Sequence, residues 1–166
     1  MDYKNKKNIE IERKFLIKKL PDNLDSYPKK KISQGYLNTS PVIRIRSEDN
    51  KYFLTYKGNG LIKHTEYNLP LDKISFDKLI QKCEGFIIYK TRYIIPLKGY
   101  PALKAELDVF EDTFKGLVIV EVEFEDEQSA GLFIPPDWFG EDVSLDKNYH
   151  NSNLSIKGSP CKTTGI

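Results

Sequence analysis

Charged residues occupy alternate positions in the first strongly patterned segment of this chain, which reads Ile-Glu-Ile-Glu-Arg-Lys-Phe from Ile9 to Phe15. Successive side chains of a β-strand point to opposite faces, so Glu10, Glu12 and Lys14 would share one face of a strand. The other face carries the apolar residues and one arginine. Because the apolar face must meet a core, the regular charge on the opposite face needs a separate explanation.

The same spacing of charge returns in later segments, and each close pair carries a single sign. The pairs are Arg44 with Arg46, Lys90 with Arg92, Glu106 with Asp108, and Glu121 with Glu123, and single charges stand at Lys57 and Glu66. A solvent-facing strand surface, which is the ordinary interpretation of any one such segment, usually mixes both signs with Ser, Thr and Asn. Taken together, the segments predict that the charged faces of several strands line a shared interior.

Alternation of apolar and polar residues predicts about eight strands joined by short turn-rich segments. They are Ile9–Ile17, Lys31–Leu37, Val42–Ser47, Tyr52–Lys57, Thr65–Leu69, Phe86–Pro96, Lys104–Phe110 and Leu117–Glu125. An antiparallel sheet of this size removes its exposed edges by closing on itself. We therefore expect an α+β fold that is mainly β, an eight-stranded antiparallel closed β-barrel with a few flanking helices. An open, strongly curved sheet is the alternative.

A helix is predicted within Asp72–Glu84, where apolar residues recur at helical spacing and Ser75 is the expected N-cap. Its apolar face is made by Phe76, Leu79, Ile80 and Cys83. This face needs an apolar outer sheet surface to pack on, which turns the charged strand faces inward. Two further helices are expected over Asp126–Phe133 and Lys147–Ile156.

The amino-acid composition limits which class of protein this chain belongs to and which partners it can bind. Lys and Arg number 26 against 24 Asp and Glu, and no aromatic platform is interleaved with the bases, so no nucleic-acid partner is expected. Cys83 and Cys161 are not spaced as metal ligands or as a redox pair.

The sequence lacks an apolar signal region and any apolar stretch of membrane-spanning length, so we expect a cytoplasmic protein with no membrane partner. One domain over 1–157 and a mobile tail over 158–166 are expected, and monomer and homodimer both stay open.

Acids and bases gathered in one interior are costly unless each charge is paired or binds an ion. Arginine suits phosphate because its planar fork binds two oxygens at once. Carboxylates repel such an anion, but they hold Mg²⁺ or Mn²⁺, which bridge to phosphate oxygens. The combination predicts a site for a metal–polyphosphate complex, with the composition expected of metal-assisted phosphoryl transfer.

The opening segment also resembles a known motif. Glu10-Ile-Glu12-Arg-Lys14 is similar to the Glu-x-Glu-x-Lys signature of the CYTH superfamily, the triphosphate tunnel metalloenzymes, and the chain resembles its short bacterial inorganic triphosphatases. The later charged residues follow in the family's order, and Gly140–Leu154 resembles the C-terminal part of the short bacterial members. The resemblance spans about residues 9 to 156, and the ordered set is more specific than the first motif alone.

The resemblance implies an eight-stranded tunnel that binds a linear triphosphate with a divalent metal. The implied metal ligands are Glu10, Glu12, Asp108, Glu121 and Glu123. The implied phosphate-binding residues are Arg44, Arg46, Lys57, Lys90 and Arg92. Lys14 and Tyr36 are implied to orient or deprotonate the attacking water, and further tunnel-lining residues are expected at Glu66, Glu106 and Lys147. Arg13, on the opposite strand face, is expected outside the site, and the isolated His64 and His150 are expected to be surface or core residues.

The expected activity is hydrolysis of a triphosphate, first of all inorganic tripolyphosphate to pyrophosphate and phosphate. A class IV adenylate cyclase or a thiamine triphosphatase is the alternative on the same fold, and a non-catalytic polyphosphate-binding module is an alternative of a different class. Cyclic AMP formed from ATP and manganese would favour the cyclase. Tight binding of polyphosphate without metal would favour the binding module.

Overall fold

The structure is a computed structural model that describes residues 8–158. Within this range the chain forms nine strands, three α-helices and three short 3₁₀ helices. The strands are β1 (Ile9–Ile17), β2 (Lys29–Thr39), β3 (Val42–Glu48), β4 (Lys51–Lys57), β5 (Lys63–Leu71), β6 (Glu84–Leu97), β7 (Tyr100–Phe110), β8 (Val118–Glu123) and β9 (Phe139–Asp142). The helices are α1 (Lys73–Ile80), α2 (Glu127–Leu132) and α3 (Asn151–Lys157), with 3₁₀ turns η1 (Leu24–Ser26), η2 (Asp112–Phe114) and η3 (Lys147–Tyr149).

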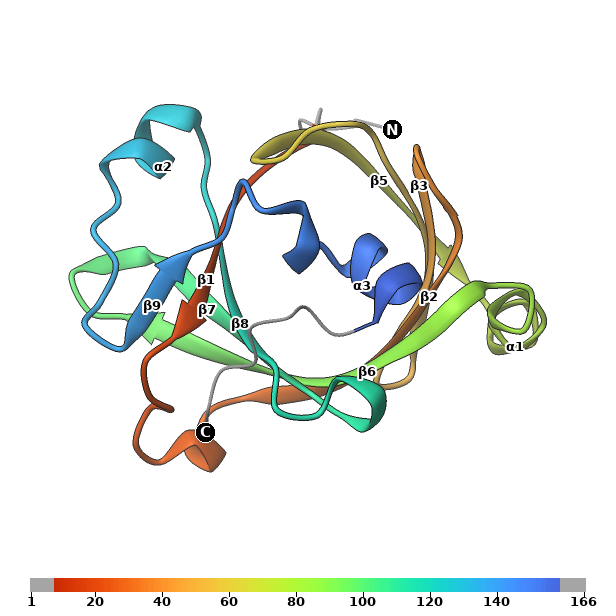
Figure 1. Cartoon of the computed structure of the whole chain (residues 1–166), viewed down its shortest axis with the longest axis horizontal. Helices are drawn as coiled ribbons and strands as arrows, with labels where there is room; N and C mark the ends of the chain where they lie inside the picture. The colour runs from red at the N-terminus through yellow and green to blue at the C-terminus, as the bar shows by residue number, and fades with distance from the viewer. Residues whose placement is uncertain (1–7, 159–166) are drawn as a thin grey trace, which may run out of the picture.

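Eight of the strands close into an antiparallel barrel, as the alternating pattern predicts (Figure 1). Their order around the barrel is β1, β5, β4, β3, β2, β6, β7 and β8, after which β8 returns to β1. Strand β1 closes it by using different residues for different partners: Ile9–Ile11 pair with β5 and Glu12–Phe15 pair with β8. The alternative of an open sheet is therefore excluded.

The ninth strand, β9, pairs with the end of β1 and lies outside the barrel with α2 (Figure 1). The sequence did not predict it, because it has only four residues and no run of alternation. An apolar layer holds it in place. In this layer Phe15 of β1, Phe133 after α2 and Phe139 of β9 contact one another, with ring centroids 5.0 to 6.2 Å apart.

A second apolar layer fills one end of the barrel interior. Leu16 and Ile88 lie two residues from Lys14 and Lys90 on the same strand faces, and Tyr36 lies two residues from Gln34. All three pack there with Tyr149 of η3 and Leu154 of α3. Helix α3 lies across this opening (Figure 1). It approaches β6 so closely that a Cβ on Gly85, whose φ is +72°, would stand 2.1 Å from the Ser155 carbonyl oxygen. The C-terminal segment thus covers part of one end of the predicted tunnel.

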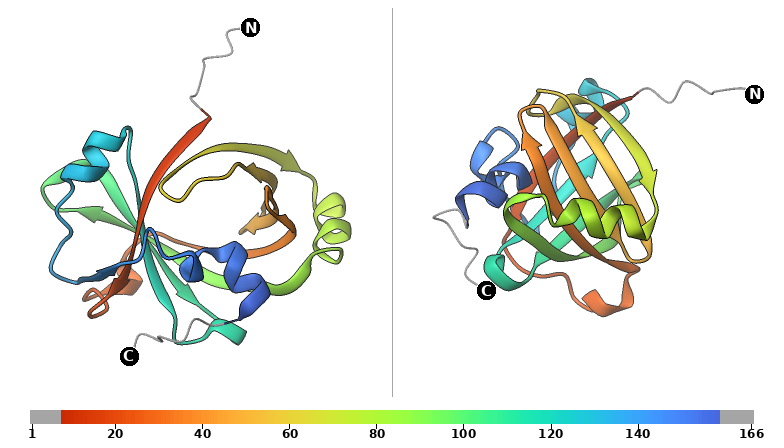
Figure 2. Two further views of the ribbon diagram at one scale, coloured as in Figure 1. Left: turned by 45° about the horizontal axis from the view of Figure 1, so that its top comes forward. Right: turned by 90° about the vertical axis from the view of Figure 1, so that its right-hand side faces the viewer.

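Helix α1 covers the outer face of β2, β3 and β4, where Phe76 is buried against Tyr52 with ring centroids 4.9 Å apart (Figure 2). This packing confirms that the charged faces of the strands point inward. The predicted N-cap was wrong by three residues: the Asp72 carboxylate accepts a hydrogen bond from the Ser75 amide, at 2.7 Å. The helix ends at Ile80, so Cys83 lies beyond it in the turn before β6.

The predicted C-terminal helix is divided in the structure. Lys147–Tyr149 form the 3₁₀ helix η3, whose N-cap is Asp146, and the α-helix begins only at Asn151. The predicted mobile tail lies, from residue 159 onward, outside the described residues. Over residues 8–158, none of the helices has the length and apolar character required to cross a membrane.

Arg13 holds β9 and α2 against the barrel, and it lies outside the interior as predicted. Its guanidinium donates to the Asp142 carboxylate at 2.6 Å and to the Ala130 carbonyl at 2.8 Å, and it lies 5.0 Å from the centre of the Phe15 ring. We expect Arg13→Gln to lower the free energy of unfolding by about 1–3 kcal/mol, because these hydrogen bonds are lost. Urea denaturation measures this change.

The matched control is Lys63→Gln, which breaks the exposed 2.7 Å pair with Glu127. Exposed pairs contribute little, so its effect should stay within about 0.5 kcal/mol. Equal denaturation midpoints for the Arg13 variant and the unmodified protein would contradict the role assigned to Arg13.

Candidate functional site

Inward-facing side chains of seven strands, together with one residue of α3, surround a cavity of about 50 Å³ in the barrel interior. The lining residues are Glu10, Glu12, Lys14, Gln34, Arg44, Arg46, Lys57, Glu66, Lys90, Arg92, Glu121 and Asn151. Strand alternation produces this arrangement, because residues two apart on each strand face the same side. The single-sign pairs seen in the sequence therefore meet in one place.

A wider cavity of about 520 Å³ opens next to α3. It shares five lining residues with the small cavity, namely Glu12, Lys14, Arg44, Lys57 and Asn151. Its wall also contains Tyr36 and Lys147, together with the turn between β4 and β5. The two cavities form a path from the surface to the charged interior.

On one wall of the interior, acids and bases are tightly paired. The Asp108 carboxylate accepts hydrogen bonds from Lys90 at 2.5 Å and from Arg92 at 2.6 Å. Burial alone would raise the pKa of Asp108, but the charges of Arg92 and Lys90 hold it below its ordinary value. Glu121 accepts from Lys14 at 2.5 Å and from Arg92 at 2.6 Å, and Arg92 also pairs with Glu106. The carboxylates of Asp108 and Glu121 are thus already balanced by cations.

On the neighbouring wall, positive charge is in excess. Arg44 is 8% exposed, and no carboxylate of residues 8–158 pairs with it. Its Nη2 donates to Thr55 Oγ1 at 3.2 Å, and its buried Nε has no partner. Arg46 pairs with Glu48 at 2.5 Å, yet its own Nε also lacks a partner. Burial, followed by the charges of Arg44 and Arg92, lowers the pKa of Arg46 to about 10.

Lys90 is affected by the same group of buried cations. Burial lowers the pKa of Lys90 to about 8 even though Asp108 opposes the shift, and Arg92 and Arg46 add to the lowering. A buried group of cations that depress one another's pKa values is stabilised when an anion enters among them. Arg44 and Arg46 offer unsatisfied donors to such an anion.

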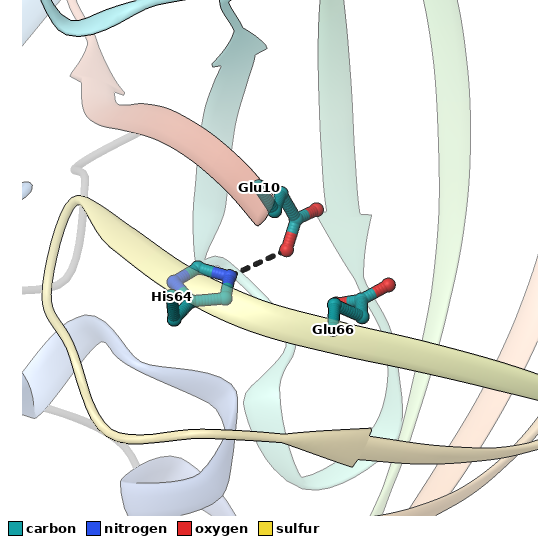
Figure 3. A group of neighbouring side chains, drawn as sticks. All are labelled: Glu10, His64 and Glu66. Atoms are coloured by element: carbon teal, nitrogen blue, oxygen red, sulfur yellow. Dashed lines mark hydrogen bonds and ion pairs between the residues drawn. The ribbon is translucent and has the colours of Figure 1, made fainter. Parts of the chain in front are cut away.

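The opposite part of the interior is acidic and contains a histidine. His64 lies directly across from Glu10 in the β1–β5 ladder, and its Nε2 is 2.5 Å from Glu10 Oε2 (Figure 3). Glu66 stands two residues further along β5, and ligand atoms of the three residues lie within 4.8 Å of one another. Lys57 approaches Glu10 at 2.9 Å. Burial would raise the pKa of Glu10, but His64 and Lys57 hold it well below its ordinary value.

Glu123 is the carboxylate of this acidic region that Lys57 does not pair with. Burial raises its pKa, and the neighbouring acids Glu10 and Glu106 raise it further. No base in the described part of the chain forms an ion pair with Glu123. Crowded carboxylates beside an imidazole are a donor set that fits a divalent cation.

Lys14 and Tyr36 both keep their protons in this arrangement. Lys14 lies between Glu12 at 2.9 Å and Glu121 at 2.5 Å, and these charges raise its pKa despite burial. Burial likewise raises the pKa of Tyr36, whose hydroxyl accepts a hydrogen bond from Gln34 at 2.8 Å. Both groups are therefore placed to donate hydrogen bonds.

The sequence missed several polar residues of the interior. His64 is buried, which agrees with the expected surface or core placement, but its contact with Glu10 was not predicted. Its position two residues before Glu66 was the available signal. Gln34 is fully buried and shares its strand face with Tyr36. Asn151 reaches the cavity from α3; it belongs to the segment Gly140–Leu154 that carries the family resemblance, but it was not predicted as a site residue.

The model of the CYTH domain family matches residues 8–155 of this sequence. The chain belongs to the CYTH family. A curated CYTH relative, the inorganic triphosphatase of Nitrosomonas europaea, is 42% identical over 151 residues, which cover 89% of this chain and 97% of the relative. The inorganic triphosphatase of Acetivibrio thermocellus is 35% identical over 151 residues, with coverages of 87% and 92%.

A solved CYTH structure agrees with the barrel described here. The crystal structure of the inorganic triphosphatase NE1496 has a TM-score of 0.68 to this chain at 38% sequence identity, and covers 91% of this chain and 97% of its own. The family resemblance predicted from the Glu-x-Glu-x-Lys motif is thus confirmed. CYTH triphosphatases depend on metal as a family, in keeping with the donor set formed by Glu10, His64 and Glu66.

Proposed function

We propose that this CYTH protein is a metal-dependent triphosphatase that hydrolyses inorganic tripolyphosphate to pyrophosphate and phosphate. The observation that carries the proposal is the guanidinium of Arg44, which is buried inside the closed barrel and donates to the Thr55 hydroxyl, with no carboxylate of residues 8–158 as its partner. A buried charge without a partner is costly, so a site that keeps one is built for a ligand of opposite charge. The names of the CYTH relatives agree with a triphosphate as that ligand.

The basic residues divide the work of binding the triphosphate. Arg44 and Arg46 offer free donors from β3, and Lys57 of β4 lies between them and the acids. Lys90 and Arg92 of β6 are held in place by Asp108. All five would neutralise charge on the transferring phosphoryl group and on the pyrophosphate that leaves.

The acidic residues would hold Mg²⁺ or Mn²⁺ beside the triphosphate. The expected ligands are Glu10, Glu12, Asp108, Glu121 and Glu123. When bound, the metal supplies Lewis-acid polarisation of the phosphate oxygens. To hold the metal, Asp108 and Glu121 would have to leave their present Lys and Arg partners, whereas no base among residues 8–158 pairs with Glu123.

Lys14 and Tyr36 would position the attacking water. Because both carry their protons, they act as hydrogen-bond donors to the water or to a phosphate oxygen rather than as bases. We expect Tyr36→Phe to lower kcat by about 10- to 100-fold with little change in KM, because a positioning contact is lost while the phosphate-binding residues remain. Steady-state kinetics measure both constants.

Tyr89→Phe is the matched control, since Tyr89 is 42% exposed on the barrel surface. Its kinetics should equal those of the unmodified protein. An unchanged kcat for Tyr36→Phe would exclude Tyr36 from the reaction.

The deciding experiment is a substrate panel with purified protein. Tripolyphosphate, ATP and thiamine triphosphate are each incubated with Mg²⁺ and with Mn²⁺, and phosphate, pyrophosphate and cyclic AMP are measured. We expect one phosphate and one pyrophosphate per tripolyphosphate. Cyclic AMP from ATP would establish the cyclase, and metal-independent binding without turnover would establish a polyphosphate-binding module. A cytoplasmic location and a monomeric or homodimeric state remain predictions.

A further inference from the structure

We propose that His64 is a metal ligand, and that Glu10, His64 and Glu66 together form a nitrogen-containing site for a divalent transition-metal ion in the barrel wall. The inference deepens the proposed function, on which it rests for the presence of a divalent cation. It adds a ligand type that affects which cation binds.

The two strands that close the barrel bring these three side chains together. Glu10 and His64 are cross-strand partners in the β1–β5 ladder, and Glu66 shares the inward face of β5 with His64. In Figure 3 the imidazole points toward the Glu10 carboxylate, and Glu66 stands next to His64 on the same strand. One ligand atom from each lies within 4.8 Å of the others. Metal bonds of about 2.1 Å place the ligand atoms of one ion roughly 3 to 4 Å apart, so small side-chain rotations complete the site.

Burial holds this donor set in place before any ion arrives. The His64 side chain is 2% exposed, and those of Glu66 and Glu10 are 15% and 22% exposed. The imidazole therefore loses little conformational entropy when an ion binds, and the carboxylates stay accessible from the interior. Preorganised ligands with one accessible side are what a metal site requires.

In the structure, Lys57 balances the negative charge of Glu10 and Glu66. Its Nζ lies 2.9 Å from Glu10 Oε2 and 3.6 Å from Glu66 Oε2. A bound divalent ion would take over this role and release the ammonium. Lys57 also lines the small cavity with Arg44, so the released ammonium would turn toward an anion there. Metal binding and anion binding would then favour each other.

The imidazole changes the expected metal preference. Mg²⁺ prefers oxygen ligands and keeps its waters, whereas imidazole suits Co²⁺, Ni²⁺ and Zn²⁺. A site with two carboxylates and one imidazole should bind Co²⁺ more tightly than Mg²⁺. A site of carboxylates alone would show a smaller difference between the two ions.

The test uses Co²⁺ and the unmodified protein without any triphosphate. A histidine that binds Co²⁺ gives a strongly shifted imidazole N–H proton signal in the NMR spectrum, and this signal disappears in D₂O. The chain has two histidines, so two variants assign the signal. We expect the signal in the unmodified protein and in the His150→Gln control, and its loss in His64→Gln. Calorimetry should show Co²⁺ binding weakened more than about tenfold by His64→Gln and less by His150→Gln.

Two results would overturn the proposal. One is a Co²⁺-loaded unmodified protein without a shifted imidazole signal, which would leave His64 only a hydrogen-bond partner that orients Glu10. The other is a signal that survives in folded His64→Gln. The spectrum of the unmodified protein and of His150→Gln decides the matter even if His64→Gln does not fold. Because triphosphate is absent, failure of the proposed hydrolysis and failure of this ligand are separate outcomes.

Discussion

Arg44→Gln is expected to lower kcat/KM for tripolyphosphate by about 100-fold or more while leaving the protein folded and no less stable. The loss corresponds to roughly 3 kcal/mol, the range of a charge-assisted contact to phosphate in a buried site. Stability is preserved because Arg44 has no carboxylate partner among residues 8–158 and its charge opposes that of Arg46. Removing it relieves repulsion and, within residues 8–158, breaks a single side-chain hydrogen bond, the 3.2 Å contact with Thr55.

Arg13→Gln is the matched control, because it removes the same charge from the outer face of the barrel. There the expected result is the reverse, namely a lower free energy of unfolding and unchanged turnover per folded molecule. Enzyme kinetics and urea denaturation on both variants form one experiment. Normal kcat/KM for Arg44→Gln would contradict the phosphate-binding role of β3.

The combined variant Glu10→Gln with Glu12→Gln should lose metal-dependent turnover by about 1,000-fold or more. The substitutions remove two negative charges from the acidic part of the interior, and the binding of a divalent ion by carboxylates depends on that charge. Glu12 also pairs with Lys14 at 2.9 Å and with Lys57 at 3.3 Å, so both ammonium groups lose a partner. Phosphate release with Mg²⁺ and with Mn²⁺ measures the loss.

Glu127→Gln is the control, since Glu127 pairs with Lys63 on the surface and its side chain is 65% exposed. Its turnover should match that of the unmodified protein. Circular dichroism establishes whether the combined variant retains the β-barrel. A folded combined variant with normal turnover would exclude Glu10 and Glu12 as the metal ligands of the reaction.

The barrel could be predicted from the sequence because strand alternation is a local signal repeated eight times. Single-sign pairs such as Arg44 with Arg46 added the decisive information, since an apolar helix face had to pack outside them. Strand β9 could not be found in this way, because four residues carry no period and its pairing with β1 is a tertiary event. The position of α3 across one opening is also set by tertiary packing, in which Leu154 meets the inner apolar layer.

Alternation predicted which charged side chains face the barrel interior, but it did not predict how they pair with one another. Alternation places Asp108 on an inward face, yet it does not say that Lys90 and Arg92 will take both of its oxygens. Nor does it distinguish Arg44, which keeps no carboxylate partner in the part described, from Arg46, which pairs with Glu48. These differences depend on strand register, which a single sequence does not determine.

Strand β1 obtains its partners from three distant parts of the chain, at residues 63–65, 120–123 and 139–142. It leaves the ribosome first among the described strands, yet its last neighbour is made more than a hundred residues later. Pairing over such separations is slow, because long loops must close before any contact forms. The barrel therefore stays open during most of synthesis, and Glu10 and His64 meet only when β1 joins β5. A nascent chain lacks the assembled site, so the growing polypeptide cannot act on triphosphate before its barrel is complete.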